Sequence, residues 1–227
     1  MHTLSHIALF PSARRESRTH FKTDMNHYPL FLDLTGRLVV IVGAGKVGRR
    51  KSLQLIQCGA RVRFVDPAGE SDGTELITEA YQAEHLEGAT LVFAAATPEI
   101  NSQVVADARA RGIWVNAADD PETGNFIVPA VLRKNGLTIA VSTGGDSPAI
   151  AKRIRESLDG FIDETWLAWL DIHRKLRPLI LEQVPDPLTR HMLFEDLTDQ
   201  SWLEFLRKEG KEKTVVAMWQ LVNEAVG

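Results

Sequence analysis

Residues 38–48 read Leu-Val-Val-Ile-Val-Gly-Ala-Gly-Lys-Val-Gly, and this stretch decides the fold of the chain. Its first five residues are apolar, which is typical of a central strand covered on both faces of a parallel sheet. Gly43, Gly45 and Gly48 follow this strand and open a helix predicted at 47–57. Glycines at this spacing allow a tight turn, a close approach of a pyrophosphate to the backbone, and close helix packing. The stretch therefore predicts a dinucleotide-binding loop, the alternative being a βαβ unit that binds no nucleotide.

The next predicted strand, 62–66, ends in an acid that bears on the choice of nucleotide. Asp66 comes about 20 residues after the glycine loop, where such folds place a ribose-binding carboxylate. It would accept hydrogen bonds from the ribose hydroxyls and repel a 2′-phosphate, which favours NAD over NADP. Arg61 and Arg63 weaken this preference. The candidate cofactor-binding residues are Gly43, Gly45, Lys46, Val47, Gly48, Asp66, Pro67, Thr97 and Asn101.

Short apolar runs alternate with helical stretches along the chain, which predicts an α/β fold with a Rossmann-type parallel sheet. Further strands are expected at 90–96, 113–117, 126–132 and 137–142, with helices at 75–83 and 101–110. From 142 onward the pattern becomes helical. Ser147 and Pro148 suit the N-cap and first turn of a helix at 149–158. Later helices are expected at 162–176, ended by Pro178, and at 202–210 and 215–226.

Composition narrows the class of protein. The chain has 227 residues, a formal net charge of -4 and a single cysteine, Cys58. The charge argues against a general nucleic-acid binder, and one thiol excludes an internal disulfide and a Cys-x-x-Cys centre. No apolar run approaches the roughly 20 residues that span a bilayer. We expect a cytoplasmic protein with a disordered tail at 1–27, in which Met25 could be the true start.

Three loops are expected at the carboxyl ends of strands, where open parallel sheets bind ligands. They are 96–101, 116–120 and 142–146. In the second loop Asp119 could take a proton, hold a cationic nitrogen or bind a metal, or it could merely cap the turn at Pro121. The third loop leads into a helix with Lys152, Arg153 and Arg155. This cluster is either a solvated face or a site for a polyanion.

Several motifs together carry a family resemblance. They are Pro29-Leu-Phe31, Val40 to Gly48 with Arg50-Lys51, Ala94 to Thr97 with Asn101, Asn116 to Asp119, Asn125-Phe126 with Pro129-Ala130, and Ala140 to Pro148. In this order they resemble the precorrin-2 dehydrogenases, the NAD-dependent modules found alone or at the N-terminus of siroheme synthases. The resemblance covers about residues 28–160 without interruption.

The resemblance implies an activity and a set of roles. Family members oxidise precorrin-2 to sirohydrochlorin with NAD, some also insert ferrous iron, and they are homodimers. Asp119 matches the family's candidate acid/base, and it is the metal residue only if the protein is a chelatase. The implied substrate-binding residues are Asn116, Ser142, Thr143, Gly144, Gly145, Lys152 and Arg153. Precorrin-2 carries eight carboxylates, and the other cations that could bind them are Arg49, Arg50, Lys51, Arg133 and Arg155.

The expected organisation is an NAD-binding domain at 28–141, a small dimerisation and substrate-cleft region at 142–162, and a helical C-terminal domain at 163–227. His173 and His191 are candidate metal ligands, although His173 lies on an apolar stripe that favours packing. Two interpretations compete with the enzyme: an NAD-sensing regulatory module without catalysis, and a dehydrogenase of another small acid. The sequence offers no catalytic histidine at a strand end, which counts against this second interpretation.

Overall fold

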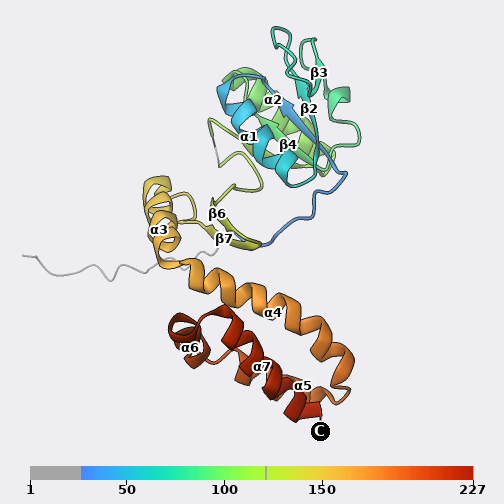
Figure 1. Cartoon of the computed structure of the whole chain (residues 1–227). Helices are drawn as coiled ribbons and strands as arrows, with labels where there is room; N and C mark the ends of the chain where they lie inside the picture. Colours follow the sequence, from blue (N-terminus) through green and yellow to red (C-terminus); the bar gives the residue numbers. More distant parts are fainter. Residues whose placement is uncertain (1–26, 121, 227) are drawn as a thin grey trace, which may run out of the picture.

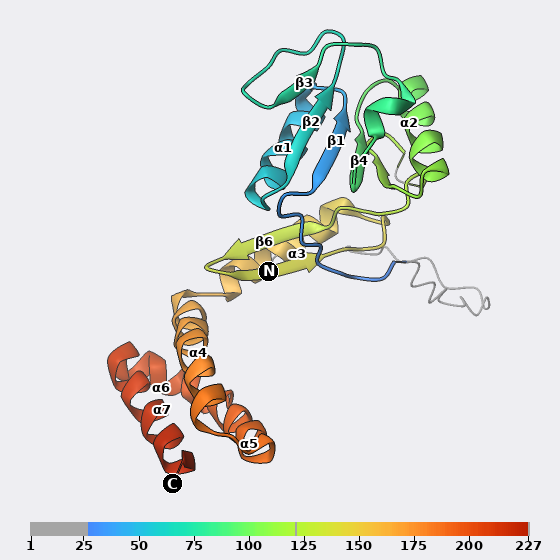
Figure 2. The same ribbon diagram turned by 90° about the vertical axis from the view of Figure 1, so that its right-hand side faces the viewer.

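The computed structural model describes residues 27–120 and 122–226, so the expected tail lies almost entirely outside it. The described chain forms three parts in a row (Figures 1 and 2): a sheet domain, a hairpin packed with one helix, and a helical bundle. This arrangement confirms the predicted α/β class with a helical C-terminal region. No helix in the described ranges combines the length and apolarity needed to cross a membrane.

The sheet domain is built on a five-stranded parallel sheet of order β3-β2-β1-β4-β5. Its strands are β1 Leu38–Val42, β2 Arg61–Val65, β3 Glu75–Ile77, β4 Leu91–Ala94 and β5 Trp114–Ala117. All five residues of β1 are buried, because the strand lies in the middle of the sheet with a helix over each face. The order reverses between β1 and β4, which is where such sheets bind ligands.

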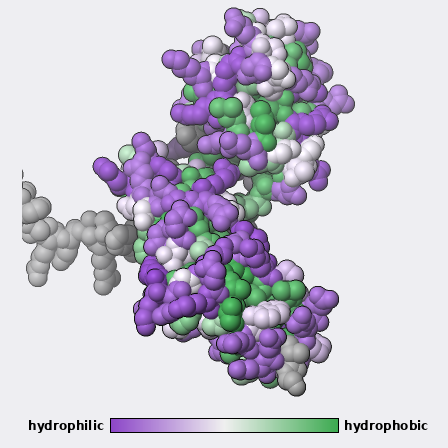
Figure 3. Space-filling model, viewed as in Figure 1, coloured by the Kyte–Doolittle hydropathy of each residue, from purple (hydrophilic) through white to green (hydrophobic). Residues whose placement is uncertain are grey.

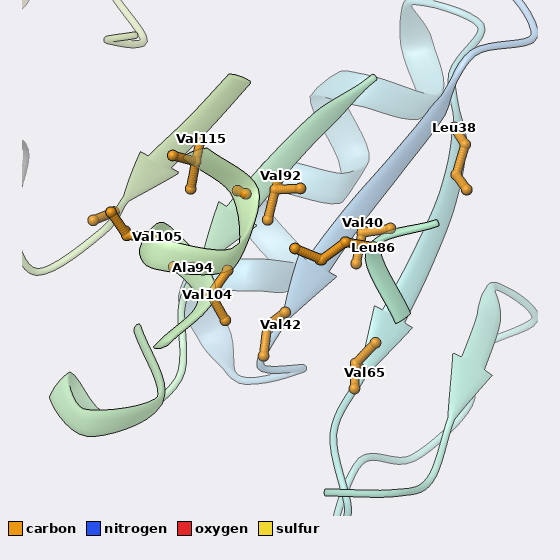
Figure 4. Close-up of a cluster of buried hydrophobic side chains, with 12 residues drawn as sticks. Leu38, Val40, Val42, Val65, Leu86, Val92, Ala94, Val104, Val105 and Val115 are labelled. Carbon is orange, nitrogen blue, oxygen red and sulfur yellow. The ribbon is translucent and has the colours of Figure 1, made fainter. Parts of the chain in front are cut away.

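Two helices cover the two faces of this sheet. Helix α1, Lys46–Gln57, packs through Leu55 on the face that carries Val39 and Ile41. Helix α2, Pro98–Ala110, packs on the opposite face. There its side chains meet the alternate residues of β1 and β4 in the cluster drawn in Figure 4. Each face thus has a core of its own, as period-two alternation along a buried strand requires.

The helix predicted at 75–83 is wrong. Residues 75–77 form the edge strand β3, paired in parallel with β2, and a single 3-10 turn, η1, follows at Ala83–Leu86. The Arg63 guanidinium pairs with the Glu75 carboxylate across the two strands at 2.5 Å. Good helix formers in this segment suggested a helix, whereas pairing with a distant strand decided the outcome.

The segment at 126–141 also departs from expectation. Strands β6, Ala130–Lys134, and β7, Leu137–Val141, form a separate antiparallel sheet and do not extend the parallel one. Asn135 and Gly136 join them with positive φ angles of 44° and 84°. This is the conformation of a two-residue hairpin turn, for which Asn-Gly is the strongest short signal. The loop at 142–146 therefore does not lie at the edge of the parallel sheet.

Helix α3, Pro148–Phe161, packs on this hairpin and begins as predicted. The Ser147 hydroxyl accepts a hydrogen bond from the Ile150 N–H at 3.3 Å, which satisfies one open donor of the first turn. At the other end, the Lys134 ammonium of β6 donates to the carbonyls of Asp159 and Ile162 at 2.6 and 3.0 Å. Both ends of α3 are thereby fixed.

We expect Ser147→Ala to weaken the first turn of α3 by about 1 kcal/mol, the usual cost of a lost N-cap. Hydrogen exchange of the Ile150 amide should accelerate about fivefold, which corresponds to that free energy. Ser157→Ala in the same helix is the control, because Ser157 is exposed and caps nothing. Equal exchange rates in wild type and Ser147→Ala would contradict the cap.

The helical bundle comprises α4 Glu164–Gln183, α5 Pro187–Leu197, α6 Ser201–Glu209 and α7 Lys211–Val226. Ile172, Ile180, Leu197 and Met218 are almost completely buried in its core. Helix α4 continues through Pro178, where an end was predicted. Pro178 lies on the exposed side of the helix, so the carbonyl that loses its partner stays near water. The sequence pattern also gave no sign of α5.

Candidate functional site

Three loops meet at the carboxyl edge of the parallel sheet, and backbone hydrogen bonds hold them side by side. The Gly43 N–H donates to the Val65 carbonyl at 2.9 Å, and the Ala95 N–H donates to the Val42 carbonyl at 2.8 Å. The Ala118 N–H donates to the Ala94 carbonyl at 2.9 Å. The glycine loop, the loop at 95–97 and the loop that carries Asp119 are therefore neighbours at one edge of the sheet.

The glycine loop can be built only from glycine at two of its positions. Gly43 has a φ of 102°, and a Cβ there would overlap the backbone carbonyl of Ala95 in the loop after β4. A Cβ on Gly48 would overlap the carbonyl of Gly43. The turn after β1 and the first turn of α1 therefore pack too closely to leave room for a side chain at either position.

Gly45 has a different role. Its φ of -73° suits any residue, and a Cβ built on it would meet nothing within 4 Å. It is the N-cap of α1, and no side chain caps that helix. The first turn, with exposed Lys46 and Val47, thus presents backbone N–H groups and the positive end of the helix dipole beside open space. This cradle, which a side chain would fill, fits the pyrophosphate of a dinucleotide.

Asp66 lies at the end of β2 and reaches the glycine loop. Its Oδ2 accepts from the Ala44 N–H at 2.7 Å, and its Oδ1 accepts from the Ala68 N–H at 2.9 Å. Each carboxylate oxygen has a second lone pair, so Asp66 can hold the loop and still accept from a ribose hydroxyl. Pro67 follows on the exposed surface.

We expect Asp66→Asn to lower the preference for NAD over NADP. The neutral amide no longer repels a 2′-phosphate, so the ratio of the NADP to the NAD dissociation constant should fall about tenfold or more. Isothermal titration with each nucleotide measures this ratio without any turnover. Because the ratio compares two ligands on one variant, a general loosening of the loop cancels. An unchanged ratio would reject the role of Asp66.

Asn101 supports the loop that faces the glycine turn. The buried Asn101 side chain accepts from the Ala96 N–H at 2.9 Å and donates to the Ala96 carbonyl at 3.4 Å. Both functional groups of the amide are engaged inside the protein, which suits a residue that positions the 95–97 loop. Thr97 begins α2 as its N-cap and is exposed beside this loop.

The two acids that follow β5 are Asp119 and Asp120. Asp120 organises the turn: its Oδ1 accepts from the Glu122 N–H at 3.2 Å, and its carbonyl accepts from the Thr123 hydroxyl at 2.8 Å. Asp119 is exposed, two residues beyond the end of β5. Pro121, whose turn Asp119 was alternatively expected to cap, lies outside the described residues. Asp119 places an exposed carboxylate at the sheet edge.

A partly buried polar network that the sequence pattern did not reveal fixes β5 beneath this loop. The Lys51 ammonium of α1 donates to Asn116 Oδ1 at 3.0 Å and lies 4.7 Å from the Phe93 ring centroid. The Asn116 amide donates to the Phe126 carbonyl at 3.1 Å. Burial, and secondarily the charge of Arg50, lowers the pKa of Lys51. Asn116, expected to contact substrate, thus has partners inside the protein.

The basic residues expected to bind substrate carboxylates differ in their partners and in their exposure. Arg49 has internal partners: its guanidinium donates to the Ala44 carbonyl at 2.9 Å and pairs with Asp72 at 2.7 Å. Arg133 contacts the Cys58 sulfur at 3.5 Å. Arg155 pairs with Glu156 at 3.2 Å. Arg50, Arg133, Lys152 and Arg153 are exposed, and Lys152 lies 3.8 Å from the Glu156 carboxylate.

The loop after β7 is shaped by its own hydroxyls. The Ser142 hydroxyl accepts from the Gly144 N–H at 3.1 Å, and the Thr143 hydroxyl accepts from the Ser147 N–H at 3.0 Å. Gly144 and Gly145 have positive φ angles of 69° and 106°, and a Cβ added to either would meet nothing within 4 Å. The loop is preformed and open, and it leads directly into Lys152 and Arg153 on α3.

The two histidines that were candidate metal ligands, His173 and His191, lie on different helices. His173 lies half-buried on α4 against Trp169, and burial lowers its pKa. His191 lies exposed on α5, 3.5 Å from Glu195. Within the described ranges, no group of three His, Cys, Asp or Glu side chains is arranged to hold a metal ion. The predicted metal role of Asp119 therefore gains no ligand partner from the described residues.

Comparisons with known sequences agree with the two parts of the chain described first. Residues 30–130 match a family model described as putative NAD(P)-binding, and residues 134–160 match one described as sirohaem biosynthesis protein central. The siroheme synthase of Pseudomonas aeruginosa (strain LESB58) is 37% identical over 182 residues, and that of Tolumonas auensis is 33% identical over 178. The alignments cover 76% and 75% of this chain but only 39% and 38% of those enzymes.

Among solved structures, the chain resembles one named SirC, precorrin-2 dehydrogenase. The TM-score is 0.72 at 24% sequence identity, and the alignment covers 86% of this chain and 100% of the other. At this identity the likeness establishes the fold. It extends the similarity beyond the sheet domain, since the sheet domain alone makes up less than half of the chain.

Proposed function

This chain is a relative of the siroheme synthases over its NAD(P)-binding and central domains, and on that premise we propose that it oxidises precorrin-2 to sirohydrochlorin with NAD. The observation that carries the proposal is the single sheet edge at which the glycine loop, Asp66 and Asp119 meet. A dinucleotide cradle and an exposed carboxylate at one sheet edge are what a dehydrogenase needs.

The residues divide the work of binding the cofactor. The open first turn of α1 around Gly45 would hold the pyrophosphate, and Asp66 the adenosine ribose. Thr97, at the start of α2, would contact the far half of a dinucleotide that crosses the switch point. When bound, NAD supplies the hydride acceptor.

The reaction removes a hydride from a ring carbon and a proton from a neighbouring position, and it yields sirohydrochlorin, NADH and H⁺. We assign the proton to Asp119, which is exposed at the edge of the sheet. A positioned carboxylate contributes about 10²–10⁴-fold to such a step. The preformed loop at Ser142, Thr143, Gly144 and Gly145, with Lys152 and Arg153 beyond it, would bind part of the substrate's carboxylates.

The same proposal includes a cytoplasmic homodimer. Helix α3 exposes Ile150, Ile154 and Phe161 at 55%, 42% and 61% of their surface. Contiguous apolar side chains on a surface helix are typical of a subunit contact. A second copy on this face would bury them in the region at 142–162, which the sequence analysis assigned to dimerisation.

The test is anaerobic incubation of the purified chain with NAD and precorrin-2. Appearance of the sirohydrochlorin spectrum together with equimolar NADH supports the proposal. NAD binding without any spectral change would reject it and favour the sensing module instead. Ferrous iron added after completion tests chelation separately, because a siroheme spectrum would then replace that of sirohydrochlorin.

A further inference from the structure

The helical bundle contains a cavity that the proposed dehydrogenation does not use. It has a volume of about 650 Å³ and lies where the turn of the β6–β7 hairpin meets α4 and α5. This volume falls in the range of about 300–1,000 Å³ that small-molecule sites occupy. Its walls include Trp166, Trp169, His173 and Phe194, and none of its lining residues comes from the parallel sheet or the loops at its edge.

Aromatic rings form most of one wall. The indoles of Trp166 and Trp169 lie 5.7 Å apart, and His173 stands edge-on to Trp169 at 5.4 Å. On the face of the molecule seen in Figure 3, apolar residues gather over the helical bundle among polar ones. A planar ring system would find both flat and edge contacts along this wall.

Two polar atoms beside the cavity have no partner. Trp169 Nε1 and His173 Nε2 are both buried and form no hydrogen bond with any described residue. Burial lowers the pKa of His173, which favours the neutral ring, and a backbone hydrogen bond to Leu197 partly opposes this shift. Orphan polar atoms are unusual in a folded protein. Both atoms are closed off from solvent, so they lie behind the ring surfaces that line the cavity, and the rings themselves are what the cavity offers to a ligand.

The charged residues that line the cavity favour a negatively charged ligand. Of the described residues that line it, none is acidic, and two are arginines of α4, Arg174 and Arg177. Arg174 donates to the Asn135 carbonyl at 2.8 Å and lies 3.8 Å from the Asp171 carboxylate, so it has partners inside the protein. Arg177 lies over the Phe194 ring at 5.1 Å, a stacking that leaves the N–H edges of its guanidinium available for a carboxylate.

From these observations we propose that the cavity binds a small planar aromatic carboxylate. The rings stack on Trp166 and Trp169, and the carboxylate pairs with Arg177. Two arginines match one or two carboxylates and not the eight of a tetrapyrrole, so this site differs from the substrate site proposed above.

The test uses N-phenylanthranilate, which combines two rings, a carboxylate and an N–H, on the full chain without NAD or tetrapyrrole. We expect a dissociation constant near or below about 1 mM, and shifts of the Trp166 and Trp169 indole N–H signals in NMR spectra. Arg177→Gln should weaken binding at least about tenfold, because a charge-assisted hydrogen bond is lost. Arg177 is exposed, so this variant should fold.

Two further variants and two further ligands decide the outcome. Lys175→Gln removes a positive charge from the same helix outside the cavity and should leave binding unchanged. Trp169→Phe should weaken binding while removing one of the shifted signals, which also assigns it. Diphenylamine has the same rings and N–H without the carboxylate, and binding as tight as that of the acid would overturn the proposal. So would tighter binding of uroporphyrin III, or no binding of the acid at all.

Discussion

Asp119→Asn should lower the rate of sirohydrochlorin formation by about 10²–10⁴-fold, the usual contribution of a positioned acid or base. NAD binding should not change, because the substitution alters neither the glycine loop nor Asp66. The amide keeps the size of the carboxylate and loses only its capacity to take a proton. Single-turnover measurements with saturating NAD, paired with titration of NAD, separate the chemical step from cofactor affinity.

Asp120→Asn is the matched control for this result. Asp120 carries the same charge one residue away, but its oxygens hold the turn at 120–123. An amide oxygen can still accept from the Glu122 N–H, so the turn should persist and most of the activity with it. Full turnover by Asp119→Asn, or an equal loss in both variants, would refute the assignment of the proton to Asp119.

The second large expected effect is a difference in stability between substitutions at Gly43 and at Gly45. Gly43→Ala should destabilise the sheet domain by about 2–4 kcal/mol, since φ is positive there and the new Cβ would overlap the Ala95 carbonyl. Gly45→Ala should cost at most about 1 kcal/mol, because its backbone is ordinary and its surroundings are open. The reason to keep Gly45 is then the ligand and not the fold.

For Gly45→Ala we therefore expect a folded protein whose NAD dissociation constant is raised about tenfold or more, because the methyl group occupies the pyrophosphate cradle. Denaturant unfolding and NAD titration of both variants give the comparison. Unimpaired NAD binding by a well-folded Gly45→Ala would show that the pyrophosphate lies elsewhere. Gly43→Ala serves as the reference for damage that acts through folding.

Local sequence signals sufficed for the central βαβ unit. The apolar run of β1, the glycine spacing and the acid after β2 act within about 25 residues of one another, and the structure confirms each element. The Asn135-Gly136 turn was equally local, and that dipeptide could have identified the antiparallel hairpin. The edge strand β3 could not be found in this way, because its pairing with β2 is what makes it a strand.

The sequence predicted where the candidate site residues lie better than it predicted what their side chains contact. Asp66 and Asp119 lie at the sheet edge, as strand ends in a parallel sheet must. Asn101 and Asn116 were expected to meet ligands, yet their amides bind Ala96, Lys51 and Phe126 inside the protein. Whether a polar side chain faces a ligand or a neighbour depends on partners up to 65 positions away, which spacing does not reveal.

The sheet domain and the helical bundle have separate hydrophobic cores, and heat should therefore melt this protein in more than one step. No buried residue of the bundle's core belongs to either face of the parallel sheet in the described chain. Each core can lose its packing while the other stays intact, so a single melting temperature would not describe the whole chain. NAD should raise only the transition of the sheet domain, and an aromatic acid only that of the bundle.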